Sequence, residues 1–163
     1  MKKLNQHTYN INFKDSNDIV LNLAQESAQV YNQTLDIFWQ NLDNNIFLSA
    51  YDLQKFVDAQ RILLHSDSYI GSIQLASTAV KIYFKILKEY KKSPNKFSGC
   101  PRQPKEHKPI QMIIFKKSAI RFKNGFLLLS TKNEPLKFRW NINKGLPVYA
   151  TITWKRETGW QLN

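Results

Sequence analysis

A dense cluster of basic residues is the part of this sequence best suited to chemistry. Residues 81–123 contain thirteen lysines and arginines, with several aromatic residues among them. Four of the lysines recur every three or four positions, namely Lys81, Lys85, Lys88 and Lys92. That spacing puts their side chains on one face of a helix. Cations mixed with aromatic rings are typical of grooves that follow a phosphate backbone and stack bases.

The charge of the chain is divided unevenly between its two halves. Residues 1–80 hold five basic and eight acidic residues, a net charge of −3, whereas residues 81–163 hold nineteen basic and four acidic ones, a net charge of +15. A face that only keeps a protein in solution usually mixes both signs. A half-chain this basic therefore indicates an acidic partner, for which a polyphosphate is the usual candidate. For any single lysine, a solvated side chain on a helix face is still the simpler interpretation.

Residue patterns for catalysis or metal binding are missing from the sequence. The three histidines are far apart, and one cysteine, Cys100, allows neither an internal disulfide nor a four-cysteine zinc site. A two-metal nuclease needs converging carboxylates, and the strand-rich half offers little beyond Glu134 and Glu157. There is no nucleophile motif and no phosphate-binding loop. We therefore expect no catalytic residue, no metal site and no cofactor in this chain.

The basic cluster must be positioned by one strand, three helices and a later run of strands. Residues 8–14 alternate apolar and polar types, as a half-buried strand does. Apolar residues at helical spacing predict helices over 19–39, 49–64 and 66–92, the last one ending at Ser93-Pro94. The predicted N-terminal cap of the first helix is Asp15 or Ser16, and that of the third helix is Ser66 or Asp67. For the second helix it is Ser49, in a capping box with Asp52.

The second half predicts a loop followed by short strands. Residues 94–109 contain four prolines and a glycine, which predicts a structured loop. Strands are expected at 111–115, 120–122, 126–130, 136–140, 148–154 and 160–162, with a hairpin turn at Asn124-Gly125. A lone first strand needs partners, so it should pair with later strands. The expected fold is therefore α+β, a small β-barrel or strongly curved sheet (1–14 and 94–163) with a three-helix bundle (15–93) inserted after the first strand.

Five segments carry a resemblance to a known family. They are Val30-Tyr31-Asn32 with Leu35; Ala79-Val80-Lys81 with Tyr83-Phe84; Lys96-Phe97-Ser98-Gly99-Cys100-Pro101-Arg102; Phe115-Lys116-Lys117-Ser118-Ala119-Ile120-Arg121-Phe122; and Pro135-Leu136-Lys137-Phe138-Arg139-Trp140. In this order they resemble the N-terminal part of the TnpB (OrfB) family. Its members are transposon-encoded RNA-guided DNA nucleases related to type V CRISPR effectors. The resemblance covers nearly the whole chain.

The resemblance implies a wedge-like β-barrel that begins with one strand, receives a helical recognition domain and is then completed. It also implies recognition of a guide RNA and of a short DNA motif, while base pairing reads the rest of the target. The implied DNA-motif residues are Ser49, Tyr51, Ser66, Tyr69, Lys116 and Lys117. The expected contacts to nucleic-acid backbone are Lys81, Lys85, Lys88, Lys92, Lys96, Arg102, Lys105, Lys108 and Arg121.

The family continues into a RuvC-like nuclease domain with an Asp/Glu/Asp metal site and a Cys-x-x-Cys zinc module. Neither is found here, and the chain ends where the last barrel strand of the family would lie. We therefore expect the chain to bind guide RNA and double-stranded DNA without cutting, and Mg²⁺ to matter only with a RuvC-like domain. Two alternatives remain open: the non-catalytic half of a split nuclease that cuts DNA with a second RuvC-like chain, and an unrelated basic RNA-binding barrel.

The expected location is the cytoplasm. A membrane-spanning helix needs about 20 consecutive apolar residues, and the apolar runs of this chain are much shorter. The basic residues also extend over helix, loop and strands, whereas binding to a membrane surface would favour one amphipathic helix.

Overall fold

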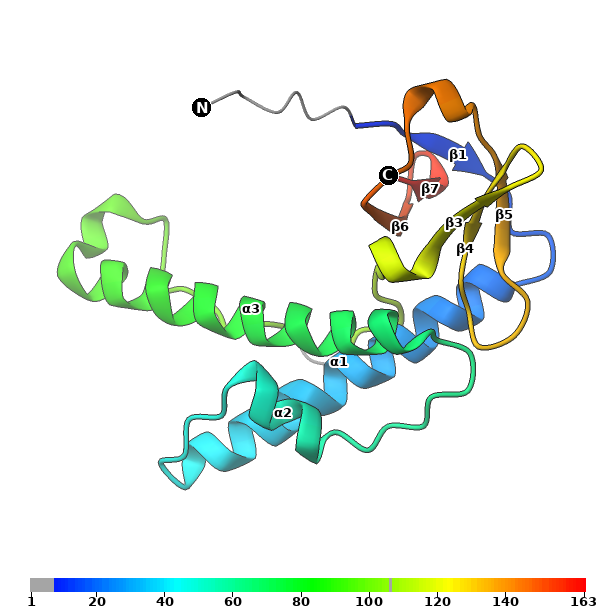
Figure 1. Ribbon diagram of the computed structural model, residues 1–163. Helices are drawn as coiled ribbons and strands as arrows, with labels where there is room; N and C mark the ends of the chain where they lie inside the picture. Colours follow the sequence, from blue (N-terminus) through cyan, green and yellow to red (C-terminus); the bar gives the residue numbers. More distant parts are fainter. Residues whose placement is uncertain (1–7, 106) are drawn as a thin grey trace, which may run out of the picture.

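The computed structural model of the protein describes residues 8–105 and 107–163 (Figure 1). This part of the chain forms three α-helices and seven strands, so the expected α+β class is confirmed. The predicted segment 1–14 contributes the first strand, and its first seven residues lie outside the described part. None of the described helices is both long enough and apolar enough to cross a membrane.

The helices are α1 (Ile19–Asp43), α2 (Ala50–Phe56) and α3 (Ser66–Lys92). α1 and α3 pack together with α2 beside them, below the strands in Figure 1. Helical spacing of apolar residues produces this layer, because it gives each helix a face that must be buried. The face that they share is built from Leu35, Phe38, Ile73, Ala76 and Val80, all of them buried.

The predicted N-terminal cap is correct for α2 and wrong for α1 and α3. Ser49 does form a capping box with Asp52, as predicted. For α1 the prediction was wrong, because the N-cap is Asp18 in a left-handed conformation with φ 53°; Asp15 still helps, since its carboxylate accepts a hydrogen bond from the Leu21 N–H at 2.8 Å. For α3 the N-cap is His65, so Ser66 and Asp67 are not the cap, and the His65 Nδ1 accepts the N–H of Asp67 at 3.2 Å.

The second helix is shorter than predicted. It ends at Phe56, and residues 57–65 run as an irregular segment. The cause is Glu26 on α1, whose carboxylate accepts hydrogen bonds from three backbone N–H groups at 2.8–3.2 Å, those of Ile62, Leu63 and Leu64. Glu26 is only 7 % exposed, so these bonds satisfy a buried charge and hold the segment on α1.

The seven strands form two antiparallel sheets. The strands are β1 (Ile11–Phe13), β2 (Ile113–Lys116), β3 (Ile120–Lys123), β4 (Phe126–Leu129), β5 (Leu136–Arg139), β6 (Tyr149–Lys155) and β7 (Gly159–Leu162). Their orders are β1-β7-β6-β2 and β3-β4-β5. β1 pairs with β7, with Phe13 opposite Trp160, which confirms that the first strand pairs with a later one.

Side chains from the two sheets meet in a common core. The rings of Phe13 on β1 and Phe138 on β5 lie 5.0 Å apart, and those of Tyr9 and Trp140 lie 5.4 Å apart. The predicted hairpin turn between β3 and β4 is confirmed, because Asn124 and Gly125 have φ angles of 52° and 80°. Within the described residues the strand ladders stay in these two sheets and do not close into one ring.

Helices and strands are joined where β2 crosses α3. A Cβ placed on Gly71 would lie 3.1 Å from the Cβ of Ile114, a tight contact, so the close approach favours glycine. Nearby, the Ser27 hydroxyl on α1 donates to the Met112 carbonyl at 2.9 Å and lies 2.8 Å from the Ser72 hydroxyl. These contacts fix α1, α3 and the start of β2 to one another. They thereby determine where Lys116, the last residue of β2, lies.

Candidate nucleic-acid interface

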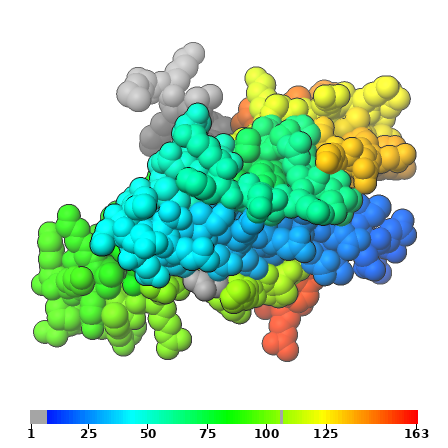
Figure 2. Space-filling view, turned by 90° about the horizontal axis from the view of Figure 1, so that it is seen from below, coloured from blue at the N-terminus to red at the C-terminus, as the bar shows by residue number. Residues whose placement is uncertain are grey.

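The four lysines at helical spacing lie along the second half of α3. We call Lys81, Lys85, Lys88 and Lys92 the lysine row, and all four are exposed. The last buried residue of α3 is Val80, so the row occupies a stretch of helix that extends beyond the core. Figure 2 shows this end of α3 and the loop after it (green) standing out past α1 (blue to cyan). The sequence prediction of one basic helix face agrees with this arrangement.

Lys116 extends the lysine row toward the strands. Its Nζ donates a hydrogen bond to the Oε1 of Gln74 on α3 at 3.0 Å. Gln74 precedes Lys81 by two helical turns and therefore lies on the same face of α3. At about 1.5 Å per residue, the distance along the helix from Gln74 to Lys92 is about 27 Å. One strand and one helix, distant in sequence, thus form a continuous line of cations.

Lys117 lies at the same junction. It begins the short 3₁₀ turn Lys117–Ala119, in which the Ser118 hydroxyl donates a hydrogen bond to the carboxylate of Asp67. Asp67 is in the first turn of α3, next to the predicted DNA-motif residue Ser66. The structure therefore brings Ser66, Lys116 and Lys117 to the first half of α3.

Tyr69 is near this junction in sequence but is engaged elsewhere. Its hydroxyl donates a hydrogen bond to the Val57 carbonyl at 3.2 Å, and the side chain is half-buried. Burial, with a further contribution from the Asp58 charge, raises the pKa of Tyr69 above its usual value. Its hydroxyl holds the segment after α2, which leaves Tyr69 a smaller role in contacting a ligand.

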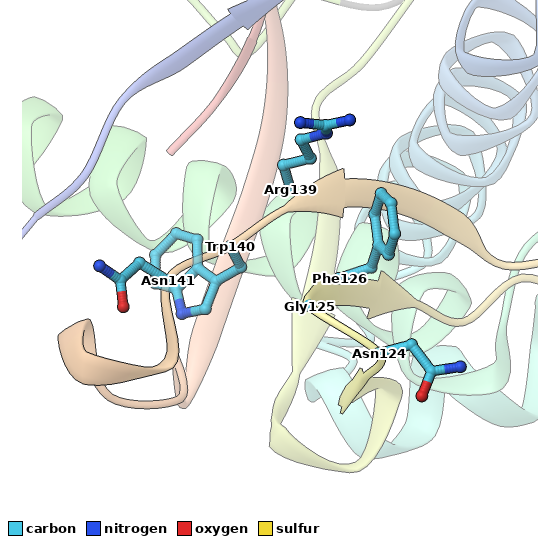
Figure 3. Close-up of a pocket in the computed structure, with 6 residues that line it drawn as sticks. All are labelled: Asn124, Gly125, Phe126, Arg139, Trp140 and Asn141. Atoms are coloured by element: carbon cyan, nitrogen blue, oxygen red, sulfur yellow. The ribbon is translucent and has the colours of Figure 1, made fainter.

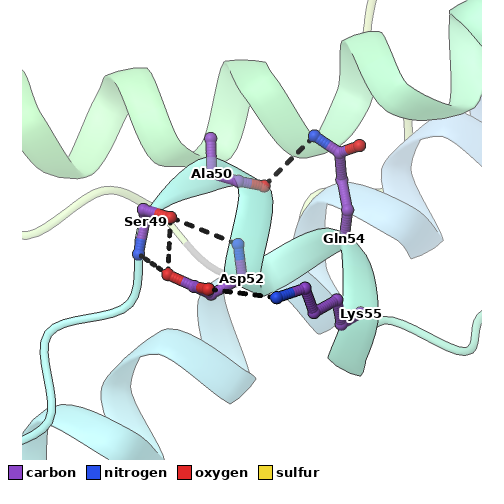
Figure 4. A network of polar contacts seen from close by, with 5 residues as sticks. All are labelled: Ser49, Ala50, Asp52, Gln54 and Lys55. Carbon is purple, nitrogen blue, oxygen red and sulfur yellow. Dashed lines mark hydrogen bonds and ion pairs between the residues drawn. The ribbon is translucent and has the colours of Figure 1, made fainter.

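The remaining predicted DNA-motif residues lie at the start of α2 (Figure 4). The Ser49 hydroxyl accepts the N–H of Asp52 at 3.2 Å and donates to its carboxylate, and these hydrogen bonds lower the pKa of Asp52. Tyr51 is 68 % exposed, with the Lys55 Nζ 4.4 Å from its ring centre. In the described part of the chain, no hydrogen bond, ion pair or ring contact connects Ser49 or Tyr51 with Lys116 or Lys117. The six predicted residues are therefore not one cluster.

The proline-rich loop carries four of the predicted backbone contacts. Lys96, Arg102 and Lys105 are exposed. Lys108 is held more firmly, because its backbone exchanges two hydrogen bonds with the Asn32 side chain on α1, at 3.0 and 3.1 Å. Its Nζ lies 4.4 Å from the centre of the Tyr31 ring, and burial, with repulsion from Lys105, lowers the pKa of Lys108. Lys108 therefore helps to dock the loop on α1.

The strands add a second basic surface. The predicted backbone residue Arg121 is exposed on β3, and the alternation of the strands puts three further exposed cations on the same side of the sheet. They are Lys123 on β3 with Lys137 and Arg139 on β5. The site prediction omitted these three, although the alternating sequences Ile-Arg-Phe-Lys and Leu-Lys-Phe-Arg already contained the signal.

The positive charge of both surfaces is not neutralised by ion pairs. Within residues 8–105 and 107–163, the ion pairs are Lys55 with Asp52 at 3.6 Å and His65 with Asp67 at 4.0 Å. All lysines and arginines after residue 80 therefore lack a described carboxylate partner. Such a concentration of one sign of charge attracts polyanions and increases their rate of association.

The described residues contain no group of three or more His, Cys, Asp or Glu that could hold a metal ion. No protein-family model and no curated protein matches the chain.

Proposed function

We propose that the protein is the nucleic-acid-binding recognition lobe of a transposon-type RNA-guided DNA nuclease. In this role it holds a guide RNA and recognises a short DNA motif, and this chain supplies no catalytic domain. The observation that carries the proposal is the line of cations without ion-pair partners along α3, continued by Lys116. The resemblance of the sequence to the TnpB family supplies the more specific identity.

The lysine row suits the phosphate backbone. Its side chains are exposed, long and flexible, so they can neutralise phosphates without reading sequence. A duplex carries one charge per about 1.7 Å of its axis, so the stretch of about 17 Å of helix from Lys81 to Lys92 faces many phosphates. The row would therefore contribute affinity and register on the nucleic acid.

Lys116 and Lys117 suit a recognition role better than the row does. Lys116 is held by Gln74, and the Ser118–Asp67 hydrogen bond fixes the turn that contains Lys117. A cation whose position is fixed can distinguish base edges, because a guanine presents two acceptors in the major groove. We infer that these two lysines contact the DNA motif.

The two sheets would form the wedge-like barrel of such a lobe. The pairing of β1 with β7 and the contact between Phe13 and Phe138 support this assignment, since both bring the first strand to the strands after the helices. The segment from α1 to α3 would then be the inserted recognition domain.

DNA cleavage would require a RuvC-like domain together with Mg²⁺, and we expect the assembly to act in the cytoplasm. The test is to purify the chain from its native cells and sequence the RNA bound to it. A transcript from a transposon end supports the proposal, whereas bulk ribosomal RNA favours an unrelated RNA-binding protein.

A cleavage assay with Mg²⁺ and labelled duplex DNA separates the remaining possibilities. The purified chain alone should leave the DNA intact. Cutting by this chain alone would contradict the proposal, and cutting that needs a second polypeptide would identify it as half of a split nuclease.

A further inference from the structure

The outer face of the sheet β3-β4-β5 combines cations with apolar side chains. The pairing register aligns two rows across the three strands, Arg121–Leu128–Lys137 and Lys123–Phe126–Arg139. Their neighbours on the strands, such as Leu127 and Leu129, are buried, so both rows face away from the core. The central strand thus carries a partly exposed ring and a partly exposed leucine between two pairs of cations.

A hollow of about 440 Å³ opens at the end of this sheet (Figure 3). It is lined by Asn124, Gly125, Phe126, Arg139, Trp140 and Asn141. The Trp140 indole N–H donates to the Gly145 carbonyl at 2.9 Å, which fixes one wall. The Asn124 side chain is exposed at the rim of this hollow, so its amide can bind a ligand.

The chemistry of this surface matches a nucleotide better than other anions. Lys123 and Arg139 on either side of Phe126 can bind phosphates, the Phe126 ring can stack on a base, and the Asn124 amide can donate to and accept from a base edge. Neither the three strands nor the hairpin between β3 and β4 contains a carboxylate that would repel a phosphate.

A flat ring on a sheet can reach a base only if the base is unstacked. In a duplex the base faces are covered by their neighbours, whereas in single strands, loops and bulges they are free to stack on protein rings. We propose that the outer face of β3-β4-β5 binds single-stranded nucleic acid, with one base stacked on Phe126. This inference deepens the proposed function, because it rests on nucleic-acid binding and assigns single strands to a surface separate from the lysine row.

The test compares Phe126→Leu with the wild-type chain and with Phe126→Tyr. The leucine keeps an apolar side chain without a ring, and the tyrosine keeps the ring. Binding is measured with a labelled oligouridylate of about 12 nucleotides and, separately, with labelled duplex DNA. Stacking of one base predicts about tenfold weaker oligouridylate binding for Phe126→Leu, near wild-type binding for Phe126→Tyr and unchanged duplex binding for both.

A second readout reports stacking directly. An oligonucleotide with a single 2-aminopurine should lose fluorescence on binding to the wild type and keep more of it with Phe126→Leu. To check that Phe126→Leu keeps the fold, its circular dichroism is compared with that of the wild type. The double variant Lys123→Ala with Arg139→Ala, both exposed positions, should also weaken oligouridylate binding by about tenfold.

Two results would overturn the inference. The first is that Phe126→Leu and the double variant bind oligouridylate as tightly as the wild type does. The second is that the wild type binds duplex DNA but no single strand. The proposed function would still stand in either case if the wild type binds duplex DNA. If the wild type bound neither probe, the proposed function itself would fail.

Discussion

The Nζ of Lys116, the last residue of β2, donates a hydrogen bond to the Oε1 of Gln74 in the first half of α3 at 3.0 Å. This contact places a cation from the returning strand on the helix face that carries the lysine row. Ile114, two residues before Lys116 on β2, packs on Gly71 of α3. This contact determines where Lys116 lies along the helix. The packing of the fold thereby assembles a basic line that neither element forms alone.

If Lys116 and Lys117 read the DNA motif, replacing both with alanine should reduce discrimination between DNA sequences more than RNA binding. A lost contact to a base edge should cost about 1–3 kcal/mol, which is about five- to 150-fold in affinity. Competition binding with a library of duplex sequences measures the discrimination. Lys14→Ala, which removes an exposed cation from the less basic half, is the control. Equal loss of RNA and DNA binding would show that the two lysines only hold backbone.

The lysine row should contribute affinity without specificity. Changing all four lysines to glutamine should weaken binding to all sequences alike and reduce the slope of log affinity against log salt by up to about four. The fold should be retained, because no residue of α3 after Val80 is buried and glutamine favours helix nearly as well as lysine. Filter binding over a range of salt concentrations measures both quantities. A sequence-dependent loss would contradict this division of roles.

The approach of β2 to α3 makes a separate prediction about stability. Gly71→Ala should lower the free energy of unfolding by about 1–2 kcal/mol, because the contact of its Cβ with the Cβ of Ile114 at 3.1 Å in a packed core outweighs the gain of up to about 1 kcal/mol from alanine in a helix. Urea unfolding followed by circular dichroism measures the change. Gly99→Ala, in the loop after α3, is the control for adding a methyl group without a close contact, since nothing lies within 4 Å of a Cβ added there. Equal stability of the two variants would show that the joint can relax.

The capping box predicts a pH effect at the start of α2. Hydrogen bonds from Ser49 hold the pKa of Asp52 below its ordinary value, so Ser49→Ala should raise it. Because the pKa is lowered in the folded state, the stabilisation is present above the unfolded pKa and is lost as the pH falls through the folded one. The carboxyl carbon shift of Asp52, followed by NMR from neutral to acidic pH, reports the pKa. An unchanged value in Ser49→Ala would contradict the capping role.

The sequence predicted those features that depend on neighbouring residues. The Asn124-Gly125 turn, the Ser49 capping box and the alternation of β3 and β5 all follow from types and spacing within a few positions. The spacing of the lysine row likewise predicted one helix face. These local patterns needed no knowledge of the tertiary structure.

What the sequence did not predict depends on long-range contacts. α2 ends at Phe56 while the apolar pattern runs on to Leu64, because Glu26 on α1 binds the backbone of residues 62–64 instead. In the same way, the position of Lys116 beside Gln74 and the alignment of Phe126 between Lys123 and Arg139 follow from strand pairing and packing. Periodicity along the chain contains no information on such partners.

The dependence of affinity on salt tests the central claim most directly. The lysine row with Lys116 and Lys117 offers six cations, none paired with a described carboxylate. If each neutralises one phosphate, about six condensed counterions are released, and binding of the full chain to labelled duplex DNA should weaken by about 10³-fold between about 50 and about 200 mM salt. A flat response over that range would contradict the account, because it would show that these cations do not bind phosphate.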